Sequence, residues 1–301
     1  MSWVAGLLLA PLLLGLVRRT QALFAGRTGP PLLQAYRDLF KLFGKGAVIS
    51  HTATWVFRAG PAVGLATAAA ALALLPGGGP ALFAFPGDPV LLVALLALAR
   101  FATMLAALDT GSAFEGMGAS REAAFSVFAE PALLLCLASL GRATGEWSLS
   151  GIFGSLTARL WLESTGVLLL VAVALFGVLL VENARIPFDD PATHLELTMV
   201  HEVMVLDHGG PDLAFLELAA AFKLWILSGL VAGVVLPVHG GSAGLDALAH
   251  LGGVAAVGLA IGVVESTMAR LRLNRVPQML VGVGLLALLS LALGPDLGSS
   301  R

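Results

Sequence analysis

The residues best suited to chemistry lie together between Glu182 and Asp212, in the segment ENARIPFDDPATHLELTMVHEVMVLDHGGPD. This segment combines carboxylates, histidines and an arginine, although the chain around it is mostly hydrocarbon. Carboxyl and imidazole groups that are removed from water titrate away from their ordinary pKa values and can pass protons to one another. Because an apolar chain gathers few ionisable groups without a use for them, we expect the functional site in this segment.

Three interpretations of this segment are open. A metal site would use His and Glu as ligands, but His201-Glu202 is not followed by the second histidine of the zinc-protease motif. A solvated loop is the plainest alternative. We favour a polar network that is buried or covered by a partner. A short helix from about 192 to 206, after a break at Arg185-Ile186-Pro187, would place His194 and His201 on one face.

Ionisable residues inside the apolar runs extend the candidate site. Glu130 lies about nine residues into its run, and the adjacent Pro131 frees a backbone carbonyl. Charges inside a membrane are costly unless they are paired or hydrated, and they mark ion or proton pathways. Carboxyls near one another titrate as a coupled set, as in a proton relay. For Glu217 and Glu265, snorkelling at a span end is the alternative. The other ionisable residues in or at the ends of the runs are Arg100, Asp109, Glu182 and Lys223.

The elements that must position these residues are membrane helices. The chain has 301 residues, of which 58% are hydrophobic and 12% charged, and its mean hydropathy is +0.93. Soluble domains carry about 25% charged residues, and apolar runs of about 20 residues read as membrane spans. We predict an all-α fold, a single transmembrane domain over residues 1–301. The expected spans are 3–25, 55–75, 89–108, 122–141, 161–183, 217–238, 245–268 and 276–294.

The basic residues predict the orientation of these spans. Arginines and lysines are concentrated in the connections after the odd-numbered spans, which the positive-inside rule places in the cytoplasm. Both termini are then expected on the outer side, and the segment 184–216 becomes a cytoplasmic acidic and histidine-rich loop with a short helix. The first run lacks the basic leader of a signal peptide, so we expect it to be retained as a span.

Residues 31–46 predict an amphipathic helix of a different kind. Its apolar side chains recur at helical spacing, while Arg37 and Lys41 occupy the opposite face. Such a helix lies in the membrane interface. It serves either as a membrane anchor or as a docking ledge for a soluble partner.

Composition also limits the cofactors. The net charge of −2 excludes a nucleic-acid binder driven by bulk positive charge. Cys136 is the only cysteine, so this chain can supply neither an intrachain disulfide nor the four thiolates of an iron–sulfur cluster. We therefore expect no redox centre and no metal in this chain, and any redox centre in a partner.

Three segments resemble a known family. They are GPPLLQAYRDLFKLFGKGAVI, DTGSAFEGMGASREAAFSVFAEPALL and ENARIPFDDPATHLELTMVHEVMVLDHGGPDLAFLELA. The chain resembles the membrane subunit of membrane-bound group 4 nickel–iron hydrogenases and formate hydrogenlyases, which is similar to subunit 1 of respiratory complex I. The HLELTMVHEVM form resembles the hydrogenase branch rather than the quinone-reducing one.

The resemblance implies a function as well as a fold. It implies a subunit of the prokaryotic inner membrane that docks the soluble hydrogenase arm and carries carboxylates that couple redox chemistry to proton or sodium movement. The implied partners are the hydrogenase large and small subunits, iron–sulfur subunits and antiporter-like membrane subunits, which would hold the nickel–iron centre and the clusters. The alternatives are a quinone-site subunit and a stand-alone secondary transporter.

Two sets of residues follow from the residue types and the resemblance together. For the proton path and coupling we predict Asp109, Glu130, Glu182, Asp189, Asp190, Glu196, His201 and Glu202. For the partner interface we predict Arg37, Lys41, Arg121, Glu122, Arg185, His194 and His208.

Overall fold

The computed structural model describes residues 2–189, 199–237 and 241–294. Eight helices in this part of the chain are long and apolar enough to cross a membrane, and no strand occurs in it. The predicted all-α membrane bundle is thereby confirmed. The spanning helices are α1 (Ser2–Phe24), α3 (Trp55–Ala73), α4 (Asp88–Asp109), α5 (Ala113–Thr144), α8 (Thr165–Glu182), α9 (Gly210–Val235), α10 (Ala243–Thr267) and α11 (Val276–Leu293).

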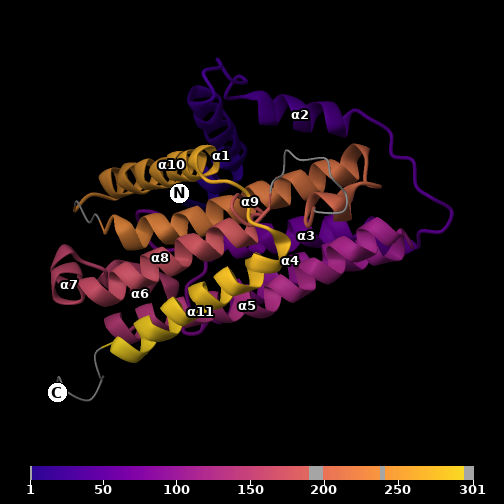
Figure 1. The fold of residues 1–301 in the computed structure, drawn as a ribbon. Coiled ribbons are helices and arrows are strands. Elements are labelled where there is room, and N and C mark those ends of the chain that lie inside the picture. Colours follow the sequence, from indigo (N-terminus) through magenta and orange to yellow (C-terminus); the bar gives the residue numbers. More distant parts are fainter. Residues whose placement is uncertain (1, 190–198, 238–240, 295–301) are drawn as a thin grey trace.

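Shorter helices connect or flank the spans. They are α2 (Gln34–Phe43), α6 (Leu149–Ser155), α7 (Ala158–Glu163), and the 3₁₀ turns η1 (Glu202–Val205) and η2 (Leu273–Arg275). Figure 1 shows α2 at the edge of the bundle, where it contacts α9 and α1. The side chains of Arg37 and Lys41 on α2 are exposed. Whether α2 lies in a membrane interface remains a prediction.

Several boundaries differ from those expected. Helix α5 begins at Ala113 rather than near 122, because the Gly- and Ser-rich start of this helix lowers its hydropathy without preventing helix formation. Helix α9 begins at Gly210 rather than near 217, with Pro211 in its first turn and Asp212 beside the positive end of the helix dipole. In the expected helix 192–206, residues 202–205 form a 3₁₀ turn, and residues 192–198 lie outside the described part of the chain.

Helix α9 occupies the centre of the bundle. It contacts α1, α2, α3, α8 and α10, and about two thirds of the residues in its apolar part are buried inside the protein. We call the end of the bundle with Asp109, Glu182 and Gly210 the site end, and the opposite end, with Val235 and Ala243, the far end. A polar side chain on α9 can therefore contact several spans at once, so α9 is well placed to carry residues of a buried site.

The turn η1 packs tightly on α5 at Gly118. A Cβ added to Gly118 would lie 3.0 Å from Met204 Cγ and 3.0 Å from the Val200 carbonyl oxygen, and closer still to Val203. Two residues earlier on the same helix, a Cβ added to Gly116 would meet only Leu108, at 4.0 Å. Gly118 therefore lets the segment 200–204 approach α5.

These two glycines make a matched test of that packing. We expect Gly118→Ala to lower the stability of the folded protein by about 1–3 kcal/mol, because it overpacks the contact with η1. Gly116→Ala should instead be neutral or stabilising by up to about 1 kcal/mol through helix propensity. Thermal unfolding in detergent compares the variants, and equal midpoints would show that η1 does not hold this position.

Candidate functional site

An ion cluster inside the bundle is the core of the candidate site. Arg100 on α4 lies 2.7 Å from a Glu130 carboxylate oxygen and 3.3 Å from one of Glu122, both on α5. Its guanidinium also donates hydrogen bonds to both carboxylate oxygens of Glu182, the last residue of α8. We call these four residues the Arg100 cluster. One arginine thus ties together three spans.

Burial makes these contacts costly to break. The side chains of Arg100 and Glu182 are 5% and 2% exposed, whereas that of Glu130 is 33% exposed at the edge of the cluster. Lys223 of α9 is a second cation, 4.0 Å from Glu182. The cluster and Lys223 together hold three carboxylates and two cations, so they accommodate one proton without a net positive charge.

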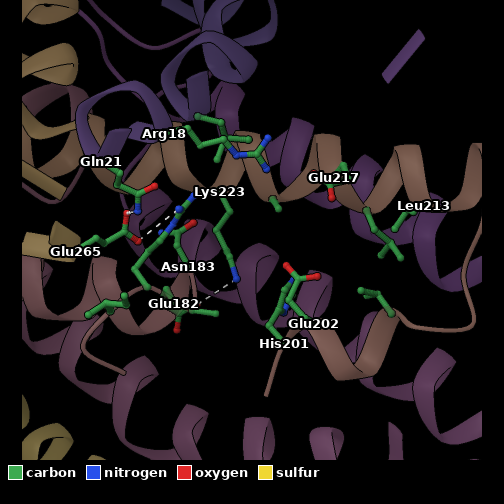
Figure 2. Close-up of a pocket in the computed structure, with 17 residues that line it drawn as sticks. Arg18, Gln21, Glu182, Asn183, His201, Glu202, Leu213, Glu217, Lys223 and Glu265 are labelled. Carbon is green, nitrogen blue, oxygen red and sulfur yellow. Dashed lines mark hydrogen bonds and ion pairs between the residues drawn. The ribbon is translucent and has the colours of Figure 1, made fainter. Parts of the chain in front are cut away.

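A cavity of about 350 Å³ adjoins this cluster at the site end. Figure 2 shows it bounded by side chains from α1, α8, α9, α10 and the segment around His201. We call it the acidic cavity. Glu182 and Lys223 line it, which places the innermost ion pair in contact with the cavity. The other charged or titratable lining residues are Arg18, Arg185, His201, Glu202, Glu217 and Glu265.

His201 and Glu202 titrate differently although they are neighbours. Burial, with Lys223 acting in the same direction, lowers the pKa of His201 to about 4, so this imidazole is neutral at pH 7. Burial, followed by the charges of Glu217 and Asp189, raises the pKa of Glu202 to about 7. At neutral pH, Glu202 can therefore both accept and release a proton at the wall of the acidic cavity.

Two further ion pairs attach the residues that follow α8 to the bundle. Arg185 lies 3.4 Å from Glu265 of α10, and Gln21 of α1 also donates to Glu265. Asp189 lies 2.8 Å from Arg270, in the connection after α10. The other oxygen of Asp189 accepts from the backbone N–H groups of Val200 and His201, at 3.1 and 3.4 Å. The position of His201 is thus set by a carboxylate that is itself paired.

Other predicted residues lie away from the cluster. Asp109, the last residue of α4, lies against the N-terminus of α3. Its carboxylate accepts hydrogen bonds from the Thr54 backbone N–H at 2.6 Å and from the Phe57 N–H at 3.2 Å. His208 is buried and stacks on Phe57, with ring centroids 4.0 Å apart. Arg121 donates to the Met199 carbonyl at 2.9 Å. Asp109 therefore serves here as a helix cap, and His208 and Arg121 hold parts of the fold together.

The structure thus divides the predicted site residues into those that lie at the cluster or cavity and those that lie elsewhere. It brings Glu122, Glu130, Glu182, His201 and Glu202 around one cluster and cavity. Three of the predicted residues, Asp190, His194 and Glu196, lie outside the described residues.

Sequence reasoning noted three important residues among the ionisable groups of the apolar runs but placed them in neither the proton path nor the partner interface. Arg100, Lys223 and Glu265 are visible in the sequence as charges inside apolar spans, but nothing there pairs them with the acids. The signal that could have found them is charge balance, because a buried charge requires a buried partner of opposite sign. Within residues 2–189, 199–237 and 241–294, no group of three or more His, Cys, Asp or Glu side chains is arranged to hold a metal ion.

Comparison with known proteins connects this site to a family. The family described as NADH dehydrogenase matches residues 1–293, nearly the whole chain. The chain belongs to the NADH dehydrogenase family. Formate hydrogenlyase subunit 4 of Escherichia coli (strain K12) is 34% identical over 283 residues, which cover 89% of each protein. Hydrogenase-4 component C of the same organism is 34% identical over 234 residues, covering 77% of this chain and 72% of that relative.

A solved structure has the same fold. A chain of the membrane-bound sulfane sulfur reductase, an archaeal respiratory membrane complex, superposes with a TM-score of 0.85 at 22% identity, covering 97% of both chains. At this identity the likeness shows the fold alone. The resemblance to hydrogenase-type membrane subunits is confirmed by the family and the two relatives, so the chain is a membrane subunit of the hydrogenase and complex I-like kind.

Proposed function

We propose that this chain anchors a soluble hydrogenase-type arm to the membrane and carries part of a proton or sodium path. Relatives named as parts of formate hydrogenlyase and hydrogenase-4 support the hydrogenase assignment. On this proposal hydrogenase large and small subunits and iron–sulfur subunits cover the site end, and antiporter-like subunits extend the membrane arm. The nickel–iron centre and the clusters would belong to those partners.

The observation that carries the proposal is the continuity of titratable groups from the site end into the bundle. Glu202 stands at the wall of the acidic cavity, Glu182 and Lys223 line its inner part, and Glu182 bonds to Arg100. Glu130 then lies at the far edge of the cluster, partly exposed. A polar cavity of this size accommodates several waters, which would link these groups for proton transfer.

The charge distribution supports an orientation in which the site end faces the cytoplasm. Arg185, Arg270 and the exposed Arg37 and Lys41 belong to this end or to the connections beside it. By the positive-inside rule the chain would then be a multi-pass protein of a prokaryotic cytoplasmic membrane with both termini outside. The exposed cations of α2 and the acidic loop are the surfaces we assign to the soluble partners.

The proposed path is tested by Glu202→Gln in the assembled complex. The amide keeps the size of the side chain but cannot carry a proton, so we expect proton translocation to fall about tenfold or more. Hydrogen evolution under uncoupled conditions should persist, because no redox centre is assigned to this chain. Translocation by the wild type should also titrate near pH 7, the pKa given to Glu202 by burial and Glu217, and the variant should lack this titration.

A matched control uses an acid outside the cavity. Glu163→Gln changes an exposed carboxylate on α7 that pairs only with its neighbour Arg159 among the described residues. It should leave translocation unchanged. Full translocation by Glu202→Gln, with the complex intact, would contradict the proposed path through the acidic cavity.

One observation favours a quinone site as the second candidate. A smaller cavity of about 80 Å³ lies between α1, α2 and α9, and it shares Leu14, Arg18 and Glu217 with the acidic cavity. A lipophilic ligand would reach the site by that route. The charged lining of the acidic cavity favours water over an isoprenoid tail. Hydrogen evolution against quinone reduction in purified membranes separates the two functions. No observation favours a stand-alone transporter.

A further inference from the structure

A second cavity lies at the far end of the bundle, away from the site described above. Its volume is about 250 Å³. It is formed by the turn 76–80, α6, the end of α9 and the start of α10. The polar side chains on its wall are those of Ser150, Asp246 and His250. We call it the far-end cavity, and nothing in the proposed function uses it.

Hydrogen bonds fix the wall of the far-end cavity. The Ser150 hydroxyl accepts a hydrogen bond from the Ala81 N–H at 2.9 Å, which attaches α6 to the turn 76–80. The buried Asp88 accepts from the Leu149 N–H at 2.6 Å and from the Phe85 N–H at 3.3 Å, which attaches the start of α4 to α6. Hydrogen bonds thus hold two segments of the wall, the turn 76–80 and α6, and join α6 to the start of α4.

His250 gives this cavity its chemistry. Its Nε2 is buried and has no hydrogen-bond partner among the residues that the structure describes. A buried imidazole nitrogen requires a donor or acceptor, and water in an adjoining polar cavity supplies one. His250 packs against α9 at Gly229, which has no side chain. A Cβ added to Gly229 would lie 3.5 Å from His250 Nε2. Gly233, one turn further, also lines the cavity.

Polar groups occur along α9 between the acidic cavity, which Lys223 lines, and the far-end cavity, which Gly233 lines. Gly229, which His250 contacts, is six residues after Lys223, a rise of about 9 Å along the helix. Between them Ser228 has a buried hydroxyl without a hydrogen-bond partner among the described residues. Lys223, Ser228 and, from α10, His250 are thus polar groups spaced along α9 in a core that is mostly apolar.

We propose that the far-end cavity is a water-filled access site on the side of the membrane opposite the acidic cavity, and that His250 exchanges protons with its water. The occupant is water or hydronium, because the volume suits several waters and the wall offers a carboxylate, an imidazole and a hydroxyl. The proton role of His250 rests on the proposed ion path, but the hydration of the cavity does not.

Hydration is tested by cysteine accessibility in the assembled complex. Cys136, the only native cysteine, is fully buried, so it provides an unreactive background. His250→Cys and Ala249→Cys place a thiol on the cavity wall. Gly252→Cys places one two residues away on the outer surface of α10, where an added Cβ meets nothing within 4 Å. A charged, membrane-impermeant methanethiosulfonate needs water and a thiolate, so it should label the wall positions about tenfold faster or more than Gly252→Cys.

The outcomes separate the two parts of the proposal. If both wall cysteines react as slowly as Gly252→Cys, the cavity is dry and the proposal is overturned. The proton role is tested by His250→Gln, which should reduce proton translocation about tenfold while leaving uncoupled hydrogen evolution intact. Unchanged translocation by His250→Gln would overturn that role. Fast labelling together with full translocation by Glu202→Gln would instead mean that the proposed path fails while the hydrated far-end cavity stands.

Discussion

Replacing Arg100 by leucine should leave little folded protein in the membrane. The substitution removes the cation that contacts Glu122, Glu130 and Glu182, and it leaves those carboxylates in or beside a low-dielectric interior. Breaking a buried ion pair from one side costs about 3–5 kcal/mol, a large part of the marginal stability of an ordinary domain. The amount of folded protein in membranes and the thermal midpoint in detergent measure this effect.

The control applies the same substitution to a surface ion pair. Arg159 pairs with Glu163 at 2.7 Å on α7, and its side chain is 86% exposed. Arg159→Leu should therefore change the midpoint very little, because exposed pairs contribute at most about 1 kcal/mol. Adding Glu182→Leu to Arg100→Leu should recover part of the loss, since it removes the most buried carboxylate of the Arg100 cluster. Equal yields of Arg100→Leu and Arg159→Leu would refute the view that Arg100 neutralises the cluster.

The sequence predicted the spans well because a membrane imposes a simple condition on composition. Eight apolar runs appear as eight long helices, since each run is long enough to satisfy its backbone hydrogen bonds within the membrane. The start of α5 was missed because residues 113–121 are too polar for a span. In the fold, Gly118 of that stretch packs against Val200 and η1, so contact with protein replaces contact with lipid.

The site was only half predictable for a different reason. Residue types identify Glu182 and Glu202 as titratable groups in an apolar chain, but their partners are distant in sequence. Arg100 and Glu182 are 82 positions apart, and Arg185 and Glu265 are 80 positions apart. Such pairings depend on which helices are neighbours. Asp109 shows a different ambiguity, because a carboxylate at a span end is equally suited to a proton path, which stays a prediction here, and to capping a neighbouring helix, here α3.

The paired residues join two parts of the chain that are distant in sequence. Asp189 connects the backbone at His201 to Arg270, and Leu271 donates to the Pro187 carbonyl at 2.9 Å. The residues before the acidic cavity and the connection between α10 and α11 are thus joined at two points. The position of His201 is therefore tied to the connection that follows α10.

Removing this connection at Asp189 should release the segment around His201. Asp189→Ala eliminates a buried carboxylate, its ion pair with Arg270 and two hydrogen bonds to backbone N–H groups. Each hydrogen bond to a charged group contributes about 1.5–3 kcal/mol. We expect hydrogen exchange at the Val200 and His201 amides to accelerate about tenfold or more, since these N–H groups lose their acceptor. Mass spectrometry of the purified protein measures this exchange.

Asp189→Asn distinguishes the two contributions. Its amide oxygen can still accept from the Val200 and His201 N–H groups, but the side chain no longer carries the charge that pairs with Arg270. Exchange should therefore lie between that of the wild type and that of Asp189→Ala. If Asp189→Ala leaves both amides as protected as in the wild type, the carboxylate does not hold this segment. The position of His201 at the acidic cavity would then have to come from the packing of η1 on α5 alone.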